Sequence, residues 1–88
     1  MVNVDKIHEA LLKRVMIIVG AKEMPEDKAM TLLNLIFTIR RNRNKSIVVG
    51  MLHVYITAVQ VFRNERFISE ETFRKLMFTE EELNEMLR

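Results

Sequence analysis

Two segments of this 88-residue chain are apolar except along one narrow line of polar side chains, and this pattern restricts the fold most. Between residues 46 and 64 the polar positions follow one another by steps of four and three; they are Ser46, Gly50, His53, Thr57, Gln60 and Asn64. At about 100° per residue they share one side of an α-helix, whereas a strand would scatter them over both faces. The segment therefore predicts a helix, despite its many β-branched residues.

The preceding segment repeats the pattern. Its polar positions also step by four and three; they are Asp27, Thr31, Asn34, Thr38 and Arg41. Pro25 followed by two carboxylates is typical of a helix start, because proline fits the first turn and acids complement the positive end of the helix dipole. We expect the two segments to form a central apolar helical hairpin.

The rest of the chain also favours helices. Gly20 is expected to end the first one in a left-handed cap, and Ser69 and Thr79 are expected N-caps, with Glu82 completing a capping box after Thr79. The sequence thus predicts one all-α domain over residues 1–88, a bundle of about five helices. These helices are expected near residues 4–20, 25–41, 45–64, 69–78 and 79–88.

The narrow polar lines also predict self-association. A chain this short has few elements to cover two helices that are apolar on nearly every side, and it has no cysteine for a disulfide. A second copy can supply the cover, so we expect a homodimer; the alternative is a monomer with the 45–64 helix at its centre. The expected interface residues are Leu32, Leu35, Ile36, Ile39, Val48, Met51, Leu52, Tyr55 and Val59.

A basic cluster separates the two apolar helices. The chain has 14 basic and 12 acidic residues, yet four basic side chains and no acid fall within six positions: Arg40, Arg41, Asn42, Arg43, Asn44 and Lys45. Guanidinium groups bind phosphates and asparagine can bond phosphates or base edges, so this loop could hold nucleic acid. The alternative is that cations and asparagine only complete the end of a helix.

The C-terminal segments offer a second candidate surface. Apolar side chains at helical spacing could dock in a groove on a partner protein, although they could equally cap the bundle's own core. They are Phe73, Met77, Phe78, Leu83 and Met86.

The chain has no recognisable catalytic constellation. It has two histidines, no cysteine and no glycine-rich phosphate loop, so we expect no enzyme activity, no cofactor and no bound metal. A small enzyme with an unrecognised site is the third hypothesis. Residues 46–62 carry no formal charge but fall short of the roughly 20 apolar residues of a membrane span, and their polar line argues against insertion.

These patterns favour a non-catalytic interaction or regulatory module, homodimeric, that acts on an unidentified protein partner. The first residues, Met1 to Lys6, lack the form of a secretory signal, so we expect a cytoplasmic location. A nucleic-acid-binding protein that uses the basic loop is the alternative function.

Overall fold

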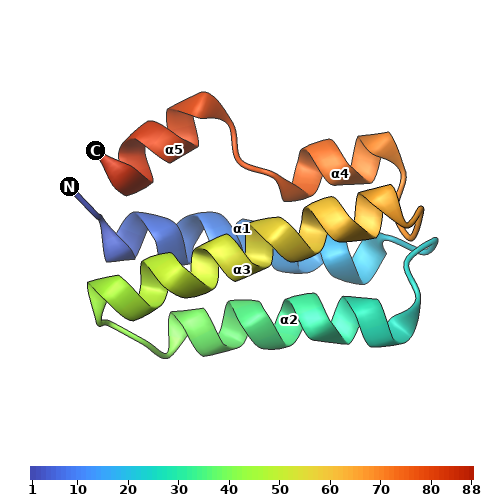
Figure 1. Cartoon of the computed structure of the whole chain (residues 1–88), viewed down its shortest axis with the longest axis horizontal. Coiled ribbons are helices and arrows are strands. Elements are labelled where there is room, and N and C mark those ends of the chain that lie inside the picture. Colours follow the sequence, from blue (N-terminus) through green and yellow to red (C-terminus); the bar gives the residue numbers. More distant parts are fainter.

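The computed structural model describes all 88 residues, which form five α-helices and no strands in a body of 35 × 24 × 20 Å (Figure 1). The fold class predicted from the sequence is confirmed. The helices are α1 (Val4–Gly20), α2 (Glu26–Arg40), α3 (Lys45–Asn64), α4 (Glu70–Leu76) and α5 (Glu80–Leu87). Because α4 and α5 form one bent arm, the body has three long helices and a fourth that is bent.

Side-chain caps fix most of the helix starts. At α1 and α3 the Asn3 and Asn44 side chains accept hydrogen bonds from backbone amides three residues later, both at 3.1 Å. The arm begins in the same way at Ser69, and the capping box of Thr79 and Glu82 at α5 is confirmed. These caps satisfy amides that have no partner within their own helix.

The predicted cap at Gly20 is wrong. α1 does end at Gly20, but no glycine in the chain has a positive φ. The chain turns at Ala21 instead, whose backbone N–H donates to the Ile18 carbonyl. The residue that does adopt a left-handed conformation is Arg66, with φ 64°, in the turn between α3 and α4.

α1 is as central to the bundle as the predicted hairpin is. α2 packs against both α1 and α3, while the arm packs across α1 with α4 also touching α3. In Figure 1, α3 runs between α2 and the arm, with α1 behind it. The core is therefore shared by all four parts of the body.

The predicted interface residues mostly lie inside this core. Seven of the nine have at most 1% of their surface exposed, and only Leu35 and Met51 are partly exposed. The structure corrects the assignment: these side chains are buried inside the bundle, so they cannot meet a second copy while the fold is kept. The seven are Leu32, Ile36, Ile39, Val48, Leu52, Tyr55 and Val59.

α3 is long and apolar enough to cross a membrane by length and composition alone. Its buried side chains, from Val48 to Phe62, nevertheless pack in the bundle core. A core helix of a bundle passes the same test of length and composition.

Candidate interaction surfaces

The large apolar side chains that remain exposed lie almost entirely on α1, α2 and α3, and none lies on α4 or α5. Scattered single apolar residues are normal on a protein surface, but a contiguous apolar patch marks an interaction site. Whether these side chains mark an interaction site therefore depends on whether they lie next to one another. They are Leu12, Met16, Val19, Met30, Phe37, Ile47, Val54 and Val61.

The first group forms one surface across α1 and α2. Two contacts fix the antiparallel register of these helices: Arg40 Nη1 donates to the His8 carbonyl at 2.8 Å, and Arg43 pairs with Asp5 at 2.8 Å. Following that register along the helices places Leu12 beside Phe37 and Val19 beside Met30. We call this surface the α1–α2 face; it consists of Leu12, Met16, Val19, Met30 and Phe37.

The second group forms a line along α3. Ile47, Val54 and Val61 are seven residues apart and 45% to 52% exposed, and we call this line the α3 stripe. An open depression of about 370 Å³ lies at its middle, lined by His53, Val54, Thr57 and Ala58. The polar line predicted from the sequence runs beside it, so the exposed side of α3 is half polar and half apolar.

His53 lies on this polar line and is exposed. Its Nδ1 is 3.0 Å from the Val49 carbonyl, one turn earlier in α3. The ring therefore has one partner within its own helix and faces solvent with its other edge.

The basic loop, residues 40–45, divides into two kinds of side chain. Arg40, Asn42 and Asn44 have structural roles: Arg40 and Asn42 each donate to a backbone carbonyl at 2.8 Å, and Asn44 caps α3. The other three, Arg41, Arg43 and Lys45, are exposed. Three of the six predicted nucleic-acid residues thus serve the fold, Arg43 is paired with Asp5, and Arg41 and Lys45 are available to a ligand.

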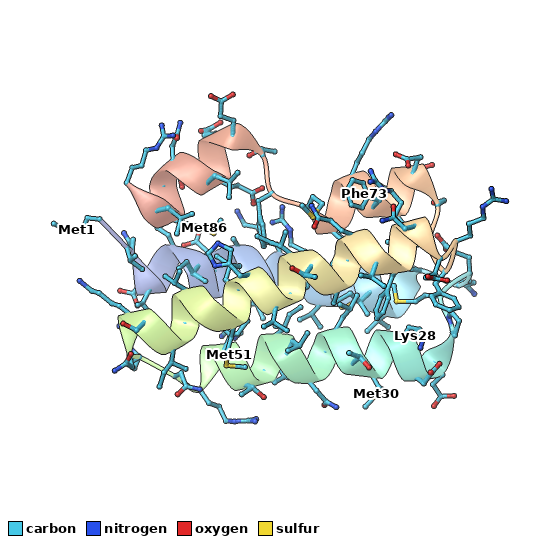
Figure 2. The ribbon with its side chains drawn as sticks, in the orientation of Figure 1. Met1, Lys28, Met30, Met51, Phe73 and Met86 are labelled. Atoms are coloured by element: carbon cyan, nitrogen blue, oxygen red, sulfur yellow. The ribbon has the colours of Figure 1, made fainter.

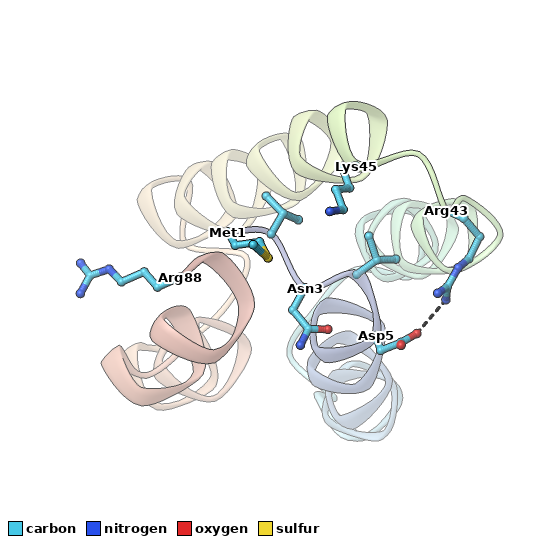
Figure 3. A pocket seen from close by; sticks show the side chains of 8 residues that line it. Met1, Asn3, Asp5, Arg43, Lys45 and Arg88 are labelled. Atoms are coloured by element: carbon cyan, nitrogen blue, oxygen red, sulfur yellow. Dashed lines mark hydrogen bonds and ion pairs between the residues drawn. The ribbon is translucent and has the colours of Figure 1, made fainter.

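An open pocket of about 330 Å³ lies beside this loop at the end of the bundle (Figure 3). Arg43, Lys45 and Arg88 line it together with a single acid, Asp5. Asp5 is already paired with Arg43, as the dashed line shows. Because Asp5 neutralises Arg43 and the Arg88 guanidinium points away from the other lining residues, Lys45 is the unpaired basic side chain at the pocket (Figure 3).

The predicted C-terminal docking residues pack against the bundle's own core. Met86 is 1% exposed, and the other four are partly buried against the core. Arg63 stacks over the Phe73 ring at 4.1 Å, and Phe78 lies between Tyr55 and Arg14. The structure corrects this assignment in favour of the alternative, in which these side chains, Phe73, Met77, Phe78, Leu83 and Met86, close the bundle (Figure 2 labels Phe73 and Met86).

Arg14 fastens the arm to α1, a role that was not predicted from the sequence. Its guanidinium is almost fully buried and binds both Glu82 carboxylate oxygens, at 2.5 and 2.6 Å, and the Met77 carbonyl at 2.8 Å. This bidentate bond holds the pKa of Glu82 below its ordinary value. The signal was present, because Arg14 falls on the apolar side of α1, between Leu11 and Ile18.

Tyr55 makes a second polar contact with the arm. Its hydroxyl donates to the Leu76 carbonyl at 2.9 Å in the core, and burial raises the pKa of Tyr55 well above its ordinary value. The hydroxyl therefore stays protonated and keeps the carbonyl at the end of α4 satisfied.

Glu23 joins the α1–α2 turn to the start of α4. Its carboxylate accepts hydrogen bonds from the Thr72 hydroxyl at 2.7 Å and from the Ser69 amide and hydroxyl, both at 3.2 Å. These bonds, that from Thr72 foremost, lower the pKa of Glu23 from 4.5 to about 2. The ionised carboxylate is thus the form that the fold binds.

Replacing Glu23 by glutamine is expected to lower the melting temperature at pH 7. It should also make the melting temperature fall less steeply as the pH is lowered. A carboxyl whose pKa is lowered by folding stabilises the protein above pH 4.5, and this contribution fades as the pH falls toward 2. Thermal denaturation from pH 7 to pH 2 tests this, with Glu81→Gln as control. A wild-type advantage that stays constant over that range would contradict the assignment.

No group of three or more histidine, cysteine, aspartate or glutamate residues lies close enough together to hold a metal ion. Comparisons with protein-family models, with curated proteins and with solved structures found no significant match to this chain. The function is therefore argued from the surfaces of the chain itself.

Proposed function

We propose that this chain is a non-catalytic interaction or regulatory module that works as a homodimer and binds a protein partner. The observation that carries the proposal is the pair of uncovered apolar surfaces, the α1–α2 face and the α3 stripe. A small monomer gains nothing from leaving eight large apolar side chains in water, whereas two binding events would cover them. One surface serves the second copy and the other serves the partner.

The α3 stripe suits the protein partner. Apolar side chains seven residues apart on a helix fit the apolar face of another helix, whose anchors recur at three and four residues. The two formal charges of α3, Lys45 and Arg63, lie on the other side of the helix, where Arg63 pairs with Glu70, so the stripe itself is uncharged. The partner that fits this surface is the apolar face of an amphipathic helix.

Substituting Val54 by glutamate tests this use of the stripe. Val54 is 52% exposed, so the change leaves the core intact but places a charge at the middle of the stripe. Immobilised wild-type protein is expected to retain a partner from cell extract that Val54→Glu loses and that Arg74→Glu, an exposed change on the arm, keeps. Equal retention by all three proteins would count against a partner site on α3.

Binding of nucleic acid is the second candidate function, supported by the three exposed cations of the basic loop and by the pocket that Arg43 and Lys45 line. It predicts that labelled oligonucleotides bind the protein and that binding weakens steeply between about 50 and 200 mM salt. The variant Arg41→Gln/Arg43→Gln/Lys45→Gln should lose binding yet remain folded. Fluorescence anisotropy measures both effects, and no binding at low salt would retire this function.

The remaining expectations from the sequence belong to the same proposal. We infer that the chain needs no cofactor, has no enzyme activity, works in the cytoplasm and does not insert into a membrane. The support for the last point is that α3 anchors its buried side chains in the bundle core along its length.

A further inference from the structure

The exposed side of α2 has two parallel lines of side chains. Asp27, Asn34 and Arg41 are seven residues apart, and so are Met30 and Phe37. Since two turns of helix take about 7.2 residues, each set runs nearly straight along the helix. Figure 2 shows Met30 on the side of α2 that faces away from α3. The outer side of α2 thus carries a charged line directly beside an apolar one.

The charges on this side are opposite at the two ends. α2 starts with Glu26 and Asp27 and ends with Arg40, followed by Arg41. The Asp27 side chain is 74% exposed even with Lys28 at 3.4 Å, and Arg41 makes only one long contact, 3.4 Å to Thr38 of its own helix. Both charges are therefore free to meet an opposite charge on another molecule.

A second copy of this chain has the charges that fit. If two α2 helices pack antiparallel about a two-fold axis at Asn34, Asp27 of each copy lies opposite Arg41 of the other. The same axis brings Met30 opposite Phe37 of the other copy. The midpoint between residues 30 and 37 falls beside Asn34, which is also the midpoint between Asp27 and Arg41. A two-fold interface requires such self-complementarity.

α3 fails this test. Its two formal charges, Lys45 and Arg63, are both positive and lie about 180° around the helix from Val54. Arg63 also pairs with Glu70 of the arm and stacks over Phe73, so the α3 stripe has no pair of opposite charges that could join two copies. The α1–α2 face, not the α3 stripe, is the surface that suits a second copy.

We propose that the α1–α2 face is the seam of the homodimer, with antiparallel α2 helices crossing near Asn34 and paired through Asp27 and Arg41. This inference rests on the proposed homodimer and locates its contact. α1 completes the seam, because the same axis places Leu12 of one copy beside Met16 of the other. The two α1 and two α2 helices then form an intermolecular four-helix layer.

The interface that a dimer needs is small relative to the surface of this chain. A standard specific interface buries about 800 Å² on each partner, which is a small share of the 5563 Å² that this chain exposes. The α1–α2 face runs along the 35 Å axis of the body and contributes the most exposed apolar side chains of the helices, Met16 at 73% and Val19 at 62%.

Charge reversal tests the pairing. Asp27→Arg and Arg41→Asp each place like charges opposite one another twice in a dimer, so each variant alone should raise the dimer dissociation constant at least about tenfold. A mixture of the two variants should restore association to near the wild-type level. In the mixed dimer the introduced arginine faces the introduced aspartate, and the unchanged Arg41 of one copy faces the unchanged Asp27 of the other. The matched control is Glu81→Arg, which reverses a first-turn acid on α5.

Analytical ultracentrifugation of each protein alone and of the mixture distinguishes the outcomes. Recovery in the mixture supports the seam, because it cannot arise from a change in the folding of either chain. A wild-type dimer that neither reversal weakens, or a mixture that stays weak, overturns the seam and leaves the homodimer standing. A monomeric wild-type protein overturns both. Phe37→Glu, which buries a charge in the apolar half, should dissociate the dimer independently of the ion pairs.

Discussion

Replacing Arg14 by alanine is expected to lower the free energy of unfolding by about 3 kcal/mol. The substitution leaves the Glu82 carboxylate, which is only 22% exposed, without its partner and removes the donor to the Met77 carbonyl. It also opens a gap beside Phe78, whose ring lies 4.7 Å from the guanidinium carbon. Urea denaturation followed by circular dichroism measures the change.

The control for this substitution is Arg74→Ala, at an exposed arginine of the arm, which should change stability by less than about 0.5 kcal/mol. The Arg14 variant should also lose stability less steeply in acid. In the wild type, folding lowers the pKa of Glu82, so the ionised carboxylate stabilises the protein at pH values above the ordinary carboxyl pKa. This stabilisation is lost as the pH falls through the pKa of Glu82 in the folded state. Equal losses for the two arginine variants would mean that the arm is not held by Arg14.

Replacing Ile36 by alanine is expected to destabilise the chain by about 3 kcal/mol, because the side chain is fully buried and its removal leaves a cavity. Ile36 was an interface residue on sequence grounds and is a core residue in the structure. The two roles differ in one measurable respect. A core substitution lowers stability equally at every protein concentration, whereas an interface substitution acts through the monomer–dimer equilibrium.

The free energy of unfolding should therefore be measured for wild type and Ile36→Ala at two protein concentrations a hundredfold apart. The exposed control is Val61→Ala, whose side chain is 45% exposed. The difference in unfolding free energy between Ile36→Ala and wild type should be the same at both concentrations. A difference that vanishes in dilute solution would show that Ile36 contributes to a dimer interface.

The helices could be predicted because local patterns determine them. The steps of four and three on α3 excluded a strand, and the caps at Ser69 and Thr79 lie where hydroxyl residues precede acids. The cap at Gly20 failed because glycine permits a left-handed conformation without requiring one; there, Ala21 turns the chain with φ −82°.

The surfaces could not be predicted in the same way, because exposure depends on which helices become neighbours. Periodicity separates polar from apolar sides, but it does not say that the neighbouring helices bury Leu52 and leave Val54 exposed to water. Arg14 shows the same limit: a charge on an apolar side is visible in the sequence, but its partner Glu82 lies 68 residues away. The structural role of Arg40 in the basic loop was equally hidden, because its partner is a backbone carbonyl on α1.

Self-association through apolar surfaces that the monomer leaves uncovered is the property on which the proposed function depends most directly. Size-exclusion chromatography with light scattering at micromolar concentration measures it, since one chain has a mass of 10.5 kDa. We expect a mass of twice that value, falling toward the single-chain mass in the Phe37→Glu variant. A wild-type mass of 10.5 kDa at that concentration would contradict the homodimer.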